Sequence, residues 1–557
     1  ASFGIWLIFK YKILSYFSDT LDFVIVKNLG GGSLFSAFEY IADEAFIFIT
    51  TLLIIAVAYW FGQRLIKGHA DSNDHPVHTP LKIRLRYLLP LLLVITTLLV
   101  AWVGKEPQFR YGLRKTTAYT LIAKTLDKLS DFDGDGYGFF WFPTDPDNFD
   151  SNVYPGALDI PGNGLDEDGY GGDFQLPEKK PDTLGQLPRQ AGKHILLVVL
   201  ESARADLVGK KTGDGRLVAP NLTNMAINGS QVEYAYSHTG YTVTSLRAVF
   251  NRTLSEKSNQ LRLLDFLNQS GYIISIISGQ DESFGKVAAS TGMNAPGHYY
   301  FDARTAIDDR VYPSKNSGSL RLSEERVLQQ FAKRVAETDW SKPNFFYVNL
   351  QAAHFPYHYP GMPRILINSP IARNEISYDN RKQVQATYWN AIAVADETFG
   401  RMIDTLKQKG VYGDTLVLVL GDHGESLFDD GYLGHGFALN ETQTRIPLII
   451  NQKGIEIVQA VGQSEVAEIL VTAALGRFDP KRWEDPGRSL FQFVGSLDRP
   501  QLIGIVSSGE TRTILDLNTR KLFFNQSKGW VPFDDAIHDN ALGARAKALI
   551  EAWETAR

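Results

Sequence analysis

Several side chains that suit metal chemistry come directly after buried, strand-like runs of the sequence. Glu201 follows the aliphatic run at 194–200, and Asp422 and His423 follow a second such run at 415–420. In an open α/β sheet the carboxyl ends of the strands meet at one edge, where ligands bind. Carboxylate and imidazole donors suit a divalent cation. Glu201, Asp422 and His423 are therefore predicted metal ligands, although Glu201 taken alone could equally be a helix cap.

Two further histidines have the same kind of placement. His354 follows the strand-like run at 345–350, and His435 lies between Gly434 and Gly436, in a loop where a core histidine would be unexpected. Each histidine taken singly could be an ordinary core residue. The convergence of several metal-competent side chains on strand ends and one loop favours a single functional site.

A candidate nucleophile lies in the segment 235–250, where a strand passes through a glycine-containing loop into a helix. The hydroxyl of Thr242 near the start of that helix would feel the positive end of the helix dipole. A hydroxyl next to a bound metal is more readily deprotonated and can attack phosphorus. The alternative is that Thr242 or Thr244 is simply an N-cap, a position at which threonine is common.

The elements that must position these residues alternate along the chain. Strands followed by helices indicate an α/β fold with a mostly parallel sheet and helices on both of its faces. Beyond residue 455, a hairpin-like run at 511–524 indicates a small C-terminal subdomain. The expected strands are 194–200, 232–236, 272–277, 345–350 and 415–420, and the expected helices are 220–228, 261–269, 323–338 and 381–409.

The order of these residues resembles the alkaline phosphatase superfamily, in its sulfatase-like branch that contains lipoteichoic acid synthases and lipid A phosphoethanolamine transferases. The resemblance covers roughly residues 190 to 455 and includes Ala219-Pro-Asn-Leu and the Ser426 that follows Asp-His-Gly-Glu. It implies a sulfatase-like fold with zinc or manganese at the catalytic site. By this resemblance Glu201, Thr242, Asp422 and His423 would hold that metal, and His354 and His435 would hold the transferred phosphate or a second metal.

The resemblance also assigns the nucleophile to Thr242, because Ser245 follows it at the spacing of the sulfatase pattern, with Thr244 as the fallback. Sulfatases usually carry paired acids where this chain has Glu201 and Ser202, and they modify a Cys or Ser into formylglycine. The chain has no cysteine, and threonine cannot yield that aldehyde. Phosphoryl chemistry is therefore favoured over sulfate-ester hydrolysis. The missing cysteines also exclude the disulfides of the phosphoethanolamine transferases, which lipoteichoic acid synthases do without.

These features predict a membrane-anchored, metal-dependent transferase. It would move phosphoethanolamine or phosphoglycerol from a phospholipid donor to a glycan or lipid acceptor of the cell envelope, through a covalent Thr242 intermediate. One alternative is a hydrolase, in which water takes the phospho group. Another is a non-catalytic lipid-sensing or assembly protein that keeps the fold.

Length and charge set the remaining limits. A chain of 557 residues is expected to form two or three units, and a net charge of -6 argues against nucleic acid as a partner. The runs 45–61 and 88–103 carry no charged residue and predict membrane spans, with a possible further span or interfacial helix near 3–26. The loop between the two spans is rich in Lys and Arg and should stay cytoplasmic. The catalytic part would then lie on the periplasmic or extracellular side of a bacterial inner membrane.

The predicted organisation is a membrane domain at 1–104, a linker at 105–190, a catalytic domain at 191–455 and a C-terminal subdomain at 456–557. The chain begins without Met, so further spans could precede residue 1.

The linker contains an Asp-rich segment at 131–173, with ten Asp, one Glu and neither Lys nor Arg. Asp alternating with Gly places hard oxygen ligands on a tight loop, as calcium requires. An EF-hand would have Glu at the twelfth loop position, where this chain has Phe142. A solvated acidic linker is the alternative. The predicted calcium ligands are Asp131, Asp133 and Asp135, completed by Asp166 and Asp168.

Overall fold

The computed structural model describes residues 117–139, 144–157, 159–175, 183–256, 258–312, 320–525 and 529–557. The predicted spans at 45–61 and 88–103, and the possible one near 3–26, lie outside these residues. Within the described ranges, no helix is both long and apolar enough to cross a bilayer. The membrane anchor therefore stays a prediction.

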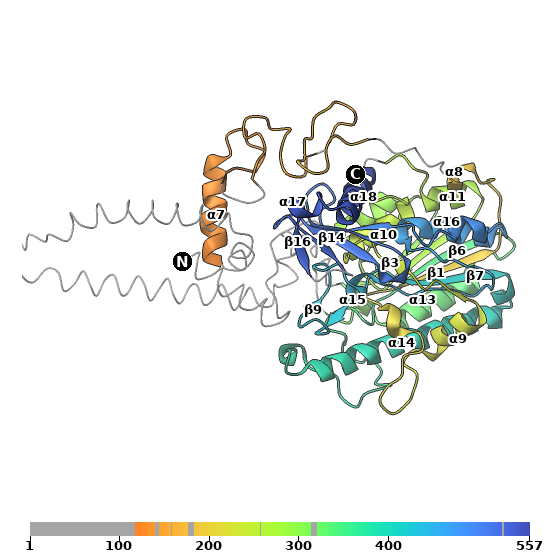
Figure 1. Cartoon of the computed structure of the whole chain (residues 1–557). Helices are drawn as coiled ribbons and strands as arrows, with labels where there is room; N and C mark the ends of the chain where they lie inside the picture. The colour runs from red at the N-terminus through yellow and green to blue at the C-terminus, as the bar shows by residue number, and fades with distance from the viewer. Residues whose placement is uncertain are drawn as a thin grey trace, which may run out of the picture.

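A seven-stranded sheet forms the centre of the larger domain (Figure 1). Its strand order is β2-β10-β7-β1-β6-β4-β5, and the five strands from β7 to β5 run parallel. Strand β10 is antiparallel to both of its neighbours, so the sheet is mixed, with the predicted parallel arrangement at its centre. The strands are β1 (His194–Leu200), β2 (Ser230–Gln231), β4 (Ile273–Ser278), β5 (Tyr299–Phe301), β6 (Asn344–Leu350), β7 (Thr415–Gly421) and β10 (Leu448–Ile450).

Strand β1 is buried on both faces because its aliphatic side chains alternate between two cores. Leu196, Val198 and Leu200 belong to one hydrophobic cluster. Ile195, Leu197 and Val199 belong to the other. A parallel strand covered on both sides needs such an unbroken apolar run, which is why the sequence predicts β1 at its observed bounds.

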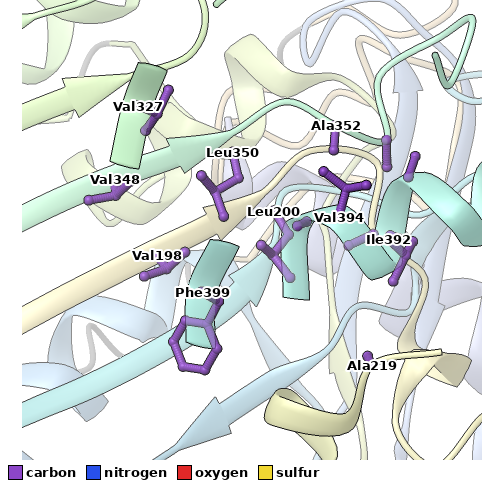
Figure 2. Close-up of a cluster of buried hydrophobic side chains, with 14 of the residues drawn as sticks. Val198, Leu200, Ala219, Val327, Val348, Leu350, Ala352, Ile392, Val394 and Phe399 are labelled. Carbon is purple, nitrogen blue, oxygen red and sulfur yellow. The ribbon is translucent and has the colours of Figure 1, made fainter. Parts of the chain in front are cut away.

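Helices cover both faces of the sheet, as predicted (Figure 1). On one face, Phe399 and Ile392 of α14 pack with Val198 and Leu350 of the strands (Figure 2). The helices of this face are α9 (Pro220–Asn228), α13 (Glu324–Glu337) and α14 (Arg381–Lys409). The helices of the other face are α10 (Thr242–Asn251), α11 (Leu263–Gln269), α12 (Val287–Thr291) and α16 (Gln463–Ala474).

The C-terminal subdomain is a five-stranded antiparallel sheet covered by α18 (Asn540–Ala556). Trp553 and Leu549 of this helix share a core with Phe493 and Leu515 of the sheet. The predicted hairpin at 511–524 corresponds to β14 and β15. The strands are β12 (Leu490–Gly495), β13 (Pro500–Val506), β14 (Arg512–Asp516), β15 (Lys521–Phe524) and β16 (Trp530–Pro532).

Two details differ from the sequence-based expectation. The prediction of a single strand at 232–236 is wrong, because a turn at 233–234 interrupts this run of residues. Strand β2 joins the large sheet, whereas β3 (Ala235–Tyr236) pairs with β11 (Val461–Gly462). The boundary expected at residue 455 falls before α16, whose apolar side chains pack in the same cluster as β1. The other α-helices and strands of the described ranges are α7 (Thr117–Ser130), α8 (Thr183–Gln186), α15 (Glu441–Thr444), α17 (Phe533–Ala536), β8 (Ser426–Leu427) and β9 (Leu433–Gly434).

Candidate active site

Adjacent strands bring Glu201 and Asp422 to the same edge of the sheet. Leu200 at the end of β1 pairs with Gly421 at the end of β7, so the next residue of each strand faces the other. Ser202 then takes a left-handed conformation, with φ of 53°, and its backbone N–H donates to Asp422 Oδ1 at 2.8 Å. This turn ends β1 while keeping the Glu201 carboxylate at the edge. Both acids are buried.

Thr242 and His423 complete a compact cluster with these two acids. The Thr242 hydroxyl donates to Glu201 Oε1 at 3.2 Å and lies 3.2 Å from His423 Nε2. His423 Nε2 lies 3.4 Å from Asp422 Oδ2 and 3.7 Å from Glu201 Oε1. Ligand atoms of Glu201, Asp422 and His423 all lie within 4.8 Å of one another. The structure thus brings together the four residues predicted to hold a metal.

The cluster fits a divalent cation. Asp422 Oδ1 accepts two backbone N–H groups, from Ser202 and His423, each at 2.8 Å. Asp422 Oδ2 is buried and makes no hydrogen bond, an arrangement that is costly unless a positive charge compensates it. Burial raises the pKa of Glu201, and it raises the pKa of Asp422 to about 6. Two carboxylates, one imidazole and one hydroxyl make a donor set that suits zinc or manganese.

The three histidines of the site are held as neutral rings with the same tautomer. Burial lowers the pKa of His354, His423 and His435 to about 4 in each case. Nδ1 of His354 donates to the carbonyl oxygen of Phe355 at 2.8 Å, and Nδ1 of His423 donates to that of Gly424 at 2.9 Å. A carbonyl can only accept, so the lone pair of each ring is on Nε2. Such second contacts fix the orientation of metal-ligating imidazoles.

His435 is oriented by an acid to which the sequence analysis assigned no role. Its Nδ1 donates to Glu425 Oε2 at 2.6 Å, and Glu425 Oε1 accepts the Tyr357 hydroxyl at 2.6 Å. The ring centroids of His435 and His423 are 4.0 Å apart. The charge of Glu201 acts on the pKa of both His354 and His435. His435 therefore lies against His423, and the charge of Glu201 reaches both His354 and His435.

Glycines allow the loop before Thr242 and the loop of His435 to touch. A Cβ added to Gly240 would lie 2.5 Å from the backbone nitrogen of Gly436. Gly436 itself has φ of 83° and packs under the Tyr241 ring, whose hydroxyl donates to the Gly436 carbonyl at 2.6 Å. Gly240 and Gly436 are thus required by the close packing of the two loops.

The helix-cap alternative for Thr242 does not match the structure. Thr242 is the first residue of α10, and the N-cap position belongs to Tyr241, which makes no side-chain capping bond. The Thr242 hydroxyl instead contacts Glu201 and His423. Thr244 lies two residues further on, about 200° around the helix, so it points away from these contacts.

Gln351 is a second residue that the sequence analysis missed. Its Nε2 donates to Glu201 Oε2 at 3.2 Å and to Asn349 Oδ1 at 3.0 Å. Gln351 follows β6 directly, at the same sheet edge as Glu201. A polar residue directly after a buried strand was the available signal. For Glu425 the signal was an acid two residues after His423.

The chain resembles known proteins over this same region. Residues 193–466 match the sequence model of the family described as Sulfatase. This segment is a sulfatase-family domain. The resemblance to the sulfatase-like branch of the alkaline phosphatase superfamily is thereby confirmed, and the match extends past the predicted boundary at 455.

Two curated relatives and one solved structure illustrate the similarity. The chain is 31% identical over 157 residues to the multifunctional alkaline phosphatase superfamily protein PehA of Trinickia caryophylli, covering 27% of this chain and 28% of that protein. It is 24% identical over 249 residues to the phosphatidylethanolamine transferase Mcr-2 of Escherichia coli, covering 43% of this chain and 45% of that protein. The match thus spans less than half the length of either relative. The lipoteichoic acid synthase LtaP of Listeria monocytogenes aligns with a TM-score of 0.49 at 15% identity, over 66% of this chain and 91% of that structure.

Proposed function

We propose that this protein transfers a phospholipid head group, phosphoethanolamine or phosphoglycerol, to a glycan or lipid acceptor of the cell envelope. The observation that carries the proposal is the Thr242 hydroxyl, which lies 3.2 Å from both Glu201 Oε1 and His423 Nε2. The similarity to Mcr-2 over 249 residues supports head-group transfer. We also propose that the predicted spans anchor the chain in a bacterial inner membrane, with the sulfatase domain on the periplasmic or extracellular side.

Glu201, Thr242, Asp422 and His423 would hold the catalytic metal, zinc or manganese. A bound cation would lower the pKa of the adjacent Thr242 hydroxyl and offset negative charge on the phosphate. Thr242 begins α10, and the N-terminus of a helix favours an anion. The phosphate of the donor would therefore sit between the start of α10 and the ends of β1 and β7.

The reaction would proceed in two displacements at phosphorus. In the first, Thr242 Oγ1 forms a bond to phosphorus while the bond from phosphorus to the diacylglycerol oxygen breaks. The Thr242 proton ends on that departing oxygen, and His354 or His435 can relay it because each neutral ring has a lone pair on Nε2. In the second, an acceptor hydroxyl attacks phosphorus, the Thr242–phosphorus bond breaks, and the acceptor proton returns to Thr242.

The test uses the purified full chain and phospholipid labelled in its head group. Mass spectrometry is expected to find the head-group phosphate on the peptide that contains Thr242. The adduct should form in Thr242→Ser and in the matched control Thr244→Ala, and it should be absent in Thr242→Ala. Full transfer by Thr242→Ala would refute the assignment. Free head-group phosphate without a modified acceptor would indicate hydrolysis, and wild-type protein that binds lipid without turnover would indicate a non-catalytic role.

A further inference from the structure

The Asp-rich segment after α7 lies outside the sulfatase domain and holds two groups of carboxylates. One ligand oxygen from each of Asp131, Asp133 and Asp135 lies within 4.8 Å of the others. The same holds for Asp159, Asp166 and Asp168. Asp166 and Asp168, which were expected to complete the site of the first three acids, instead form a separate group with Asp159. These two groups are the first and the second cluster, respectively.

The first cluster contains buried carboxylate oxygens that have no partner. Asp135 Oδ1 accepts the Tyr137 N–H at 2.7 Å, and Asp133 Oδ1 accepts the Asp135 N–H at 3.2 Å. The Oδ2 atoms of both are buried and make no hydrogen bond. Asp135 is only 9% exposed. Each residue thus uses one oxygen to shape the loop and leaves the second without compensation.

Asp145 is a fourth acid close to the first cluster, and its backbone N–H donates to the Gly138 carbonyl at 3.2 Å. It is 6% exposed, and its Oδ1 accepts the Asp147 N–H at 3.0 Å while its Oδ2 is buried without a hydrogen bond. Its charge interacts with those of Asp131, Asp133 and Asp135. Asp133, Asp135 and Asp145 therefore each have one buried oxygen without a hydrogen bond.

The second cluster has one such oxygen, on Asp168, because both oxygens of Asp159 and of Asp166 accept backbone N–H groups. Asp168 is 1% exposed, and its Oδ1 accepts the Tyr170 N–H at 2.7 Å while its Oδ2 is buried and makes no hydrogen bond. Glu554 of α18 lies beside Asp168 and adds a negative charge, although Glu554 also pairs with Arg557 at 2.7 Å. Burial and the charges of Glu554, Asp166 and Asp159 therefore raise the pKa of Asp168 well above its usual value.

Buried like charges without partners oppose folding unless a cation compensates them. The range 131–173 contains neither Lys nor Arg that could serve. Both clusters offer oxygen donors only, which selects a hard cation over zinc. We propose that the Asp-rich segment binds two calcium ions, one at Asp131, Asp133, Asp135 and Asp145, and one at Asp159, Asp166 and Asp168.

The position of the segment assigns these ions a structural role. Arg499 donates to the Asp135 carbonyl at 2.9 Å, and Arg557 donates to the Ala157 carbonyl at 2.8 Å. Tyr170 belongs to the same hydrophobic core as Trp553. Calcium would hold both loops in the shape that fits the C-terminal subdomain, and without it the carboxylates would repel and the loops would leave that surface.

The first test is calcium stoichiometry of the purified full chain, measured by equilibrium dialysis with radioactive calcium and excess magnesium. The wild type is expected to bind two calcium ions at the Asp-rich segment. Asp133→Asn with Asp135→Asn should lose one, and Asp166→Asn with Asp168→Asn should lose the other. Any calcium bound at the histidine-containing active site would persist in both double variants. The difference in bound calcium between the wild type and each double variant therefore reports only the proposed site.

Asp150→Asn is the matched control, because Asp150 is an exposed acid of the same segment outside both clusters. It should bind as much calcium as the wild type. A double variant that binds as much as the wild type would overturn the cluster it tests, and a wild type that binds no calcium would overturn both.

The second test uses only wild-type protein and so does not depend on whether the variants fold. Limited proteolysis within 131–175 should be rapid after calcium removal and slow again once calcium is restored. Cleavage at one rate with and without calcium would overturn the structural role.

Discussion

Replacing Gly240 with Ala tests how strongly the active site depends on contact between its two loops. The added Cβ would lie 2.5 Å from the backbone nitrogen of Gly436 and 2.8 Å from its Cα, whereas ordinary contact begins at 3.4 Å. Neither backbone atom can rotate away as a flexible side chain would. The loops of Thr242 and His435 must therefore separate by about 1 Å in a close-packed interior.

This separation should affect turnover far more than metal binding. Three of the four expected metal ligands, Glu201, Asp422 and His423, come from the ends of β1 and β7, which the Gly240 contact does not touch, and only Thr242 belongs to a loop that moves. His435 would move relative to Thr242, and a misplacement of about 1 Å costs on the order of 100-fold in kcat. The strain should also lower the free energy of unfolding by about 1–3 kcal/mol.

The assay combines turnover of head-group-labelled phospholipid with metal analysis of the same preparation. Gly213→Ala is the matched control, because a Cβ at Gly213 meets no atom within 4 Å. A folded Gly240→Ala protein with wild-type kcat would refute the argument from loop contact. Loss of metal by this variant would show that the loop contact also supports the metal ligands, contrary to the expectation that metal binding is largely preserved.

Three further predictions concern stability and metal affinity. Burial lowers the pKa of His238 from 6.5 to about 4. As the pH falls, the imidazole of the unfolded chain is therefore protonated before that of the folded protein. The free energy of unfolding should decrease by up to about 3 kcal/mol between these two pKa values. The advantage of wild type over His238→Gln in urea unfolding should shrink by that amount from about pH 7 to about pH 4, whereas Ser464→Ala, which keeps the imidazole, should show the wild-type pH dependence. Gln351→Leu removes the donor to Glu201 Oε2 and should weaken metal binding about 10–100-fold in a chelator competition, with the exposed Gln329→Leu unchanged. Phe399→Ala empties a position of α14 that is 2% exposed and should cost about 3–5 kcal/mol in urea unfolding, against less than about 0.5 kcal/mol for the exposed Ile227→Ala.

The sequence predicts best where one local pattern decides the structure. The run at 194–200 can satisfy its apolar side chains only as a buried strand, and β1 has those bounds. Helix α14 likewise occupies the predicted range of 381–409, closed by Gly410 with φ of 78°. Because the metal-competent residues follow such strands, their convergence could be predicted before any distance was known.

The sequence predicts less where the outcome depends on contacts across the fold. The run at 232–236 looked like one strand, but Val232 donates to the Leu448 carbonyl in the large sheet, whereas Ala235 and Tyr236 pair with β11. The antiparallel direction of β10 follows from the path of the preceding chain, which no local pattern records. Gln351 and Glu425 gain their roles from side chains on other elements, so their residue types alone do not reveal them.

The C-terminal subdomain supports the site because it forms hydrogen bonds with the loop that precedes Thr242. The Phe493 N–H donates to the His238 carbonyl at 2.9 Å, and Gln492 Nε2 donates to the Ser237 carbonyl at 2.7 Å. His238 Nδ1 in turn donates a hydrogen bond to the Phe491 carbonyl at 2.8 Å. These groups are buried, so each lost bond would leave an unsatisfied polar atom.

The same subdomain packs against the Asp-rich segment through Tyr170, Arg499 and Arg557. Segments that precede and follow the sulfatase domain in sequence therefore form one packed unit beside it. This unit fixes the backbone four residues before Thr242. A change that loosens the Asp-rich segment without reaching the subdomain should leave Thr242 in place, whereas a change in β12 should move it.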